Sequence, residues 1–165
     1  MDLLVVRHAI AFERDRLRWS DDTKRPLSPD GIRRSRRAAA GIKQITKPPD
    51  VVLTSPLLRA RQTADILTDV AGWPKATLCN ELVPDVAPEA LLKVLQSREE
   101  KLVALVGHEP HLSRFVAACL VGDDHSLAME LRKNGVVFLS FTAAPRAGKA
   151  SLKWFATPRM LRAMR

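Results

Sequence analysis

Two short apolar runs, each leading to a histidine, constrain the fold of this sequence most strongly. The first run covers residues 3–6 and leads to Arg7 and His8, and the second covers residues 102–107 and leads to His108. Both runs are rich in valine and leucine, as is typical of strands that are buried on both faces. Ligands of open α/β sheets bind where such strands end. The two histidines are therefore predicted to share one site at one edge of a sheet.

Other short apolar runs alternate with amphipathic segments, which is the pattern of an α/β domain. Strands are expected near residues 2–7, 51–54, 77–79, 102–107, 136–142 and 151–155. A chain of 165 residues is long enough to bury one core, so residues 1–165 are interpreted as a single domain. The expected architecture is a mixed, mostly parallel sheet flanked by helices.

Prolines mark where the helices begin. Ser28-Pro29 and Ser55-Pro56 each combine a capping residue with a proline at the first helical position. Similar signals at Pro88, Pro110 and Thr157-Pro158 predict three further helices. The inward-facing stripe predicted for the first helix consists of Ile32, Ser35, Ala39, Ile42 and Ile45. In the second helix the corresponding stripe consists of Leu57, Ala60, Ala64, Leu67 and Ala71, and Gly72 is expected to end the helix.

Four side chains suited to phosphate chemistry are predicted to meet at the sheet edge. Arg7 and His8 follow the first strand, His108 follows the fourth, and Arg59 lies in the first turn of the helix expected after the second. The amino end of that helix adds free backbone N–H groups and a positive dipole end. Two guanidinium groups can hold phosphate oxygens while a neutral imidazole attacks phosphorus.

The motifs around these residues resemble those of the histidine phosphatase superfamily. The matching segments are Arg7-His8, residues 54–64 (TSPLLRARQTA) and Val106-Gly107-His108. The short chain, Arg25-Pro26-Leu27-Ser28 and Gly107-His108-Glu109-Pro110 are most similar to the SixA branch, the phosphohistidine phosphatases. The resemblance implies a three-layer α/β/α sandwich of the phosphoglycerate mutase-like kind.

The resemblance also implies roles for individual residues. His8 matches the nucleophile that becomes phosphorylated, Arg7 and Arg59 match the phosphate-binding arginines, and His108 matches the histidine that bonds the transferring phosphoryl group. Glu81 is the nearest match to the family's acidic proton donor, although Asp85 competes with it. Ala9 replaces the glycine that usually follows the first histidine, which would cause strain if that position needed a positive φ.

The chemistry of these residues agrees with such roles. The charges of Arg7 and Arg59 should keep His8 neutral, and one ring nitrogen of His8 should donate to a backbone carbonyl. Water would then hydrolyse the phosphohistidine intermediate, with Glu81 or His108 moving protons. No metal or other cofactor is expected, because arginines can neutralise the phosphate oxygens.

Arg25 and His111 are possible accessory residues of the site. The irregular segment of residues 9–27 is a candidate wall for the site, and Arg25 either pairs with Asp21 or Asp22 or reaches the phosphate, the structural role being preferred. His111 lies three residues after His108, but no third ligand is evident. Zinc is therefore not expected, and His111 is predicted to lie at the rim of the site.

The predicted function is that of a metal-independent phosphatase acting on phosphohistidine in a protein of the histidine phosphotransfer type. One alternative is a small-molecule phosphomonoesterase on the same scaffold, whose partner would be a small phosphate ester. A further alternative is a non-enzymatic basic module that binds nucleic acid or an acidic protein.

Composition bears on these alternatives. The net charge is +9, and residues 132–165 contain eight Lys or Arg and no acid, which is interpreted as a solvated basic face. Specific nucleic-acid binding is not expected, because aromatic residues make up only 5% and tyrosine is absent. No apolar run is long enough for a membrane span, and the start of the chain does not resemble a signal peptide. A cytoplasmic location is expected.

Overall fold

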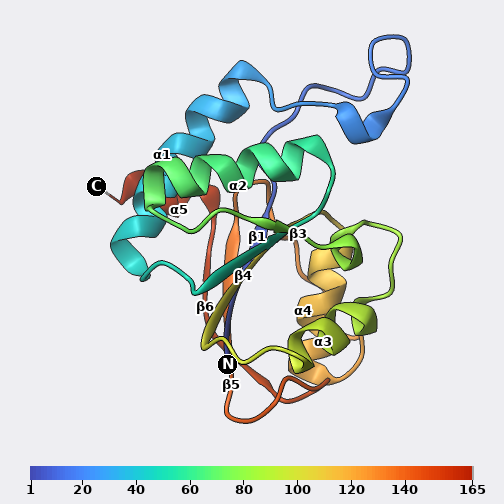
Figure 1. The fold of residues 1–165 in the computed structure, drawn as a ribbon, viewed down its shortest axis with the longest axis vertical. Helices are drawn as coiled ribbons and strands as arrows, with labels where there is room; N and C mark the ends of the chain where they lie inside the picture. The colour runs from blue at the N-terminus through green and yellow to red at the C-terminus, as the bar shows by residue number, and fades with distance from the viewer. Residues whose placement is uncertain (165) are drawn as a thin grey trace.

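The computed structural model describes residues 1–164, in which one six-stranded sheet carries helices on both faces (Figure 1). The strand order is β3-β2-β4-β1-β5-β6. The strands are β1 (Asp2–Arg7), β2 (Val51–Thr54), β3 (Thr77–Leu78), β4 (Leu102–Gly107), β5 (Val136–Phe141) and β6 (Ala150–Ala156). Strands β1 to β4 pair in parallel, whereas β5 runs antiparallel to both β1 and β6. The predicted mixed, mostly parallel sheet is confirmed.

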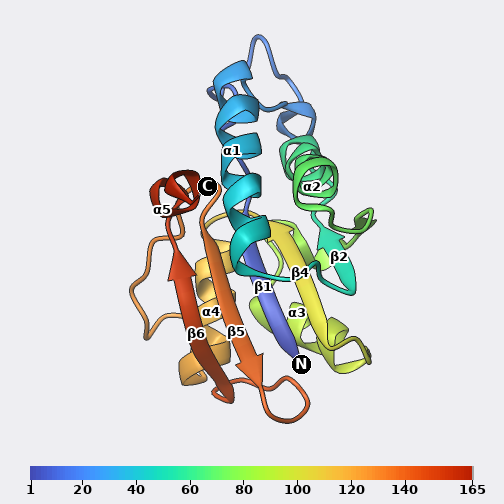
Figure 2. The ribbon, with the colours of Figure 1, turned by 90° about the vertical axis from the view of Figure 1, so that its left-hand side faces the viewer.

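The helices form two layers around this sheet. They are α1 (Pro29–Ile45), α2 (Leu58–Ala71), α3 (Pro88–Gln96), α4 (His111–Val121) and α5 (Pro158–Ala163), with short 3-10 helices η1 (Asp22–Lys24) and η2 (Asn80–Leu82). Helices α1, α2 and α5 cover one face, and α3 and α4 cover the other (Figures 1 and 2). This is the expected three-layer α/β/α sandwich.

Each face of the sheet has its own apolar core, because successive side chains of a strand point to opposite faces. In β1, Leu4 and Val6 pack under α1 and α2, whereas Leu3 and Val5 pack against α3 and α4. All four side chains are buried. The central position of β1 explains why its sequence is apolar throughout and not alternating.

The first helix begins as predicted, but its buried face differs from the predicted one. The Ser28 hydroxyl accepts a hydrogen bond from the Gly31 N–H at 3.0 Å and so caps α1. Ile32, however, is 39% exposed, so its place in the predicted inward stripe is wrong. Gly31 takes the inward place, because a Cβ there would lie 1.8 Å from the Ile10 carbonyl oxygen. The close approach of the Ile10 backbone turns Ile32 outward.

The second helix also departs from expectation at its start. It begins at Leu58, with Leu57 and not Ser55 at the capping position, so the interpretation of Ser55 as the cap is wrong. The predicted stripe, ending at Ala71, is buried, and Gly72 ends the helix in the left-handed conformation with φ of 74°. The helices expected after Pro88, Pro110 and Thr157 are all present.

Two further expectations concern the chain as a whole. Over residues 1–164, no helix combines the length and the apolar character that a membrane crossing requires. Cys79 and Cys119 are both buried and free.

Candidate functional site

The site lies where β1 and β4 end side by side. Arg7 and Gly107 are paired in the parallel register of these strands, so His8 and His108 leave the sheet at the same edge. The backbone N–H of His8 donates to the Gly107 carbonyl at 2.9 Å. The two imidazole rings have centroids 4.9 Å apart and are tilted by 53°. The structure therefore brings the two histidines together as the sequence indicates.

His8 is held in one tautomer. Its side chain is 6% exposed, and its Nδ1 lies 2.6 Å from the Ala9 carbonyl oxygen, to which it can only donate. The lone pair is therefore on Nε2. The pKa of His8 is lowered to about 3, chiefly by burial and also by the charges of Arg59 and Arg7, although the hydrogen bond with Ala9 acts in the opposite direction. The ring is a neutral imidazole with Nε2 available as a nucleophile.

Ala9 fits its position without strain. Among the residues that the structure describes, Asn134 is the only non-glycine residue with a positive φ. The Ala9 N–H donates to the Thr63 hydroxyl at 2.9 Å, and this hydroxyl donates in turn to the Arg59 carbonyl at 2.7 Å. One threonine thus ties the segment after His8 to helix α2.

His108 is oriented by a residue whose role the sequence did not reveal. Its Nε2 lies 2.8 Å from the Ser55 hydroxyl. Ser55 follows β2 directly, and its N–H donates to the Val106 carbonyl of β4 at 2.9 Å, so it lies at the same sheet edge. The pKa of His108 is lowered to about 2, first by burial and then by the charges of His8 and Arg59. The position of Ser55 directly after a strand could have indicated this role, but the proline that follows it favoured its interpretation as a helix cap.

Arg59 extends from the first turn of α2 and is also buried, with 6% exposure. Its Nη1 donates to the Asp22 carbonyl at 2.9 Å and lies 3.2 Å from the Asp22 Oδ2. Arg25 binds the same carboxylate, since its Nε lies 2.7 Å from Asp22 Oδ1, and its Nη1 donates to the Phe12 carbonyl at 2.6 Å. These contacts support the structural role of Arg25, as a residue that holds the segment of residues 9–27.

Arg7 is anchored to the segment that precedes β5. Its Nη1 donates to the Leu131 carbonyl at 2.8 Å, and its own carbonyl accepts a hydrogen bond from the Asn134 N–H at 3.1 Å. The charge of Lys133, in the same segment, also lowers the pKa of His8. Lys133 is thus a third cation near His8. The sequence did not indicate it, because no motif surrounds it.

The carboxylates are less clearly placed. Glu81, in η2, accepts a hydrogen bond from the Cys79 thiol at 3.3 Å, and Asp85 is exposed. Within residues 1–164, no hydrogen bond joins either carboxylate to His8 or His108. Glu109, which directly follows His108, was not identified from the sequence. Burial raises the pKa of Glu109, whereas a hydrogen bond from Ser113 and the charge of Arg7 act in the opposite direction.

His111 does not lie at the rim of the site. It is 1% exposed in the first turn of α4, so the predicted rim position is wrong. Helix α4 packs against the sheet and encloses the ring. Over residues 1–164, the structure contains no group of three or more His, Cys, Asp or Glu side chains arranged to hold a metal ion.

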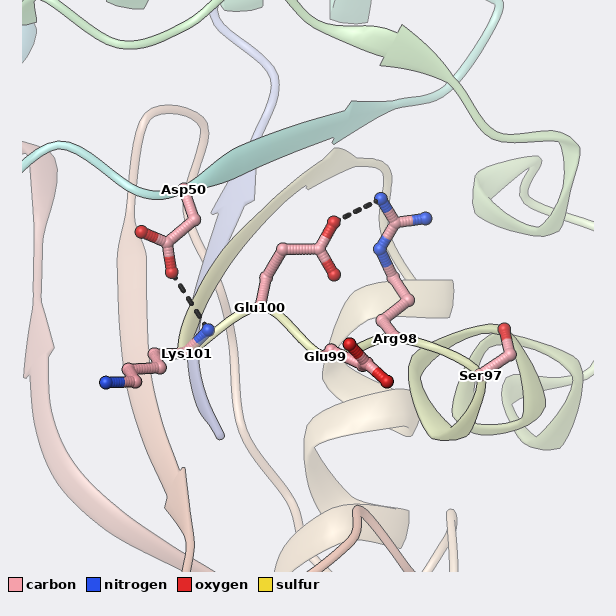
Figure 3. A pocket seen from close by; sticks show the side chains of 6 residues that line it. All are labelled: Asp50, Ser97, Arg98, Glu99, Glu100 and Lys101. Atoms are coloured by element: carbon pink, nitrogen blue, oxygen red, sulfur yellow. Dashed lines mark hydrogen bonds and ion pairs between the residues drawn. The ribbon is translucent and has the colours of Figure 1, made fainter.

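A cavity of about 780 Å³ lies at the opposite edge of the sheet, before β2 and β4 begin (Figure 3). In this cavity Arg98 lies 2.8 Å from the Glu100 carboxylate, and Asp50 accepts a hydrogen bond from the backbone N–H of Lys101 at 2.9 Å. The lining comprises Asp50 and residues 97–101, and so excludes every predicted site residue. The histidine edge remains the candidate site.

Comparisons with known proteins agree with this geometry. A family model of the histidine phosphatase superfamily (branch 1) matches residues 3–83. An uncharacterised protein of Picosynechococcus is 36% identical over 148 residues, which are 87% of each chain. The phosphohistidine phosphatase SixA of Escherichia coli is 28% identical over 130 residues, 74% of this chain and 76% of that one. The solved structure of the protein histidine phosphatase SixA complexed with tungstate superposes with a TM-score of 0.83 at 24% identity, covering 96% of this chain and 98% of that chain.

Proposed function

The chain belongs to the histidine phosphatase superfamily and is a phosphatase, and we propose that it hydrolyses phosphohistidine carried by another protein, of the histidine phosphotransfer type. The observation that carries the proposal is the pair of neutral imidazoles of His8 and His108, whose ring centroids are 4.9 Å apart and which lie near the guanidinium groups of Arg7 and Arg59. The similarity in sequence and fold to SixA proteins supports phosphohistidine as the substrate. A cytoplasmic location belongs to the same proposal and is supported by the two free thiols.

In the first step the lone pair on His8 Nε2 attacks phosphorus, in line with the bond that breaks. Arg7 and Arg59 bind the phosphate oxygens, for which guanidinium groups are suited in geometry and charge. His108, which is oriented by its hydrogen bond with Ser55, forms a hydrogen bond with the transferring phosphoryl group. The electron pair of the broken P–N bond returns to the substrate nitrogen. His8 needs no prior deprotonation, since it is already neutral.

In the second step a water molecule attacks the phosphorus bonded to His8. The P–N bond breaks, its electrons return to Nε2, and the product is inorganic phosphate. A nearby base must take the proton of the water, and His108 and Glu81 are the groups proposed for this role. Glu109 joins them as a candidate, because its raised pKa and its position beside Arg7 suit proton transfer.

An imidazole leaving group agrees with the positions of the carboxylates in the structure. In phosphohistidine the leaving group is the imidazole of the substrate. When its nitrogen that is not bonded to phosphorus carries a proton, this imidazole departs as a neutral molecule and needs no further proton. An alkoxide leaving group, by contrast, is strongly basic and must be protonated as it departs. The Glu81 carboxylate accepts a hydrogen bond from the Cys79 thiol, and within residues 1–164 no carboxylate is hydrogen-bonded to His8 or His108. A phosphomonoesterase acting on small esters is the second candidate, and Glu109 is the observation that favours it.

A comparison of substrates tests the proposal. Purified protein is supplied with a phosphohistidine-bearing phosphotransfer domain, with phosphoserine and with p-nitrophenyl phosphate, and kcat/KM is measured for each. The proposal expects the highest kcat/KM for the phosphohistidine protein. A higher value for the monoesters would assign the site to small phosphate esters instead.

A further inference from the structure

A groove of about 440 Å³ adjoins the site and is lined mainly by cationic side chains. It shares Arg7 with the site and has one carboxylate, Glu130, against five cations, which are Arg7, Arg34, Arg132, Lys133 and Arg162. We propose that this basic groove binds an acidic segment of the substrate protein while the phosphohistidine of that protein occupies the site. The inference rests on the proposed function and adds to it how the protein substrate is recognised.

The fold fixes the groove beside the nucleophile. Arg34 comes from α1 and Arg162 from α5, and these helices pack side by side (Figure 2). Their contact is close, because a Cβ on Gly41 would lie 1.9 Å from the Leu161 carbonyl oxygen. Arg7 ends β1, and Arg132 and Lys133 belong to the segment before β5. This segment is fastened to Arg7 by the Leu131 and Asn134 hydrogen bonds. The groove is therefore attached to the same residue that is proposed to bind the phosphate.

The positive charges of the groove are poorly compensated. Arg34 pairs with Asp30 at 2.6 Å, and Arg132 lies 3.5 Å from Glu130. Both pairs are exposed, and exposed pairs of this kind contribute little. Within residues 1–164, no ion pair involves Lys133 or Arg162. The pKa of Lys133 is lowered by burial and then by the charges of Arg7 and Arg25, so the cations repel one another. An anionic partner would relieve this repulsion.

The distribution of the charges favours an acidic polypeptide. The cations come from four separate parts of the chain, so several carboxylates spaced along one polypeptide can each meet a guanidinium or ammonium group. A single phosphate held at His8 and Arg7 would leave Arg132 and Arg162 unused. No aromatic residue lines the groove, which argues against the base stacking that single-stranded nucleic acids use.

The inference is tested with the double variant Arg132→Gln/Arg162→Gln in the full chain. The matched control, Arg37→Gln/Lys43→Gln, removes the same charge from exposed positions of α1 outside the groove. Each is assayed with a phosphohistidine-bearing acidic protein and with free phosphohistidine. We expect kcat/KM of the groove variant to fall by about tenfold on the protein, through the loss of electrostatic complementarity, and to stay near wild type on free phosphohistidine. Polyglutamate should inhibit wild-type turnover of the protein more than that of the groove variant.

Each other result has a definite meaning. Equal kcat/KM of the groove variant and the control on the protein would overturn the groove while leaving the proposed function standing. Equal losses on both substrates would also overturn it, because the arginines would then serve the phosphate site. Inhibition by an oligonucleotide but not by polyglutamate would assign the groove to nucleic acid. Failure of the wild type to hydrolyse either phosphohistidine substrate would remove the proposed function and the inference together.

Discussion

At the scale of single residues, the site depends on keeping two imidazoles neutral among arginines. Burial is the main cause for both His8 and His108, and the neighbouring cations add to it. A neutral His8 can attack phosphorus at neutral and mildly acidic pH. The same environment has a cost in stability, because acid favours the unfolded chain, in which these histidines ionise freely.

The pH dependence of stability follows from this. The pKa of His8 is about 3 when folded, against 6.5 as its ordinary value, so the unfolded chain binds more protons between these pH values. The free energy of unfolding should therefore fall as pH decreases from about 6.5, and it should fall less steeply in His8→Ala. Urea denaturation at pH 7 and pH 5 measures the difference. The exposed His125→Ala serves as control. An unchanged pH slope in His8→Ala would contradict the assigned environment.

The identity of the proton donor is also decided by single residues. Glu81→Gln is expected to lower the hydrolysis of phosphomonoesters by about 10²–10⁴-fold, the usual contribution of general acid–base catalysis, and that of phosphohistidine much less. The reason is that only an alkoxide must be protonated as it leaves. Steady-state kinetics of Glu81→Gln and Glu109→Gln on both substrates make the comparison. Equal losses on both substrates, or none in Glu81→Gln, would remove Glu81 from this role and leave Glu109 as the next candidate.

At the scale of elements, the Asp22 carboxylate connects the segment of residues 9–27 to helix α2. Asp22 contacts both Arg25, from this segment, and Arg59, from α2. An isolated bridge between Ala11 and Leu27 closes the base of the segment. The tip carries exposed arginines and extends away from the sheet (Figure 1). Asp22 therefore connects this segment to α2, while Ala11 and Leu27 bury its base in the core.

Limited proteolysis tests the role of Asp22. Asp22→Ala should be cleaved by trypsin within residues 14–18 about fivefold faster than wild type, since losing a hydrogen bond to a charged group costs on the order of 1 kcal/mol of local stability. Glu13→Ala removes an exposed carboxylate from the same segment and serves as control. Identical cleavage rates in the two variants would show that the segment is held by other contacts.

The sequence predicted the helices and strands better than the tertiary contacts of individual side chains. Strands and most helix starts follow from apolar runs and prolines, which act locally, so Ser28 was correctly identified as a cap. Ser55 precedes a proline in the same way, yet it bonds His108 across the sheet edge, and no local pattern separates the two cases. Ile32 was misplaced because the close approach of Ile10 to Gly31 is a tertiary contact. Lys133 reaches the site only because β5 lies next to β1.

At the scale of the whole molecule, the two edges of the sheet differ in charge. The groove at the edge with His8 has five cations and one carboxylate, whereas the cavity at the opposite edge has two cations and three carboxylates (Figure 3). The excess of +9 is thus not spread evenly, and part of the basic face that the sequence indicated borders the site. A negatively charged substrate would be attracted to this edge.

The same arrangement predicts activity without divalent metal. Arg7, Arg59 and Lys133 lie near His8 and would supply, around a phosphate bound there, the positive charge that a metal ion supplies in other phosphoryl-transfer enzymes. Hydrolysis of phosphohistidine should therefore proceed at the same rate with and without a chelator. Initial rates after dialysis against the chelator provide the measurement. A loss of activity that zinc or magnesium restores would show that the arginines do not suffice.

Direct detection of the intermediate tests the central claim. Wild-type protein is mixed with labelled phosphohistidine substrate, quenched at alkaline pH within the first turnover, and digested to locate the label. Acid-labile phosphate is expected on His8 of the wild type. In His8→Ala no phosphate should be found on the protein, and turnover should be abolished while the circular dichroism stays unchanged. Label on His108 or on any other residue of the wild type would contradict the claim.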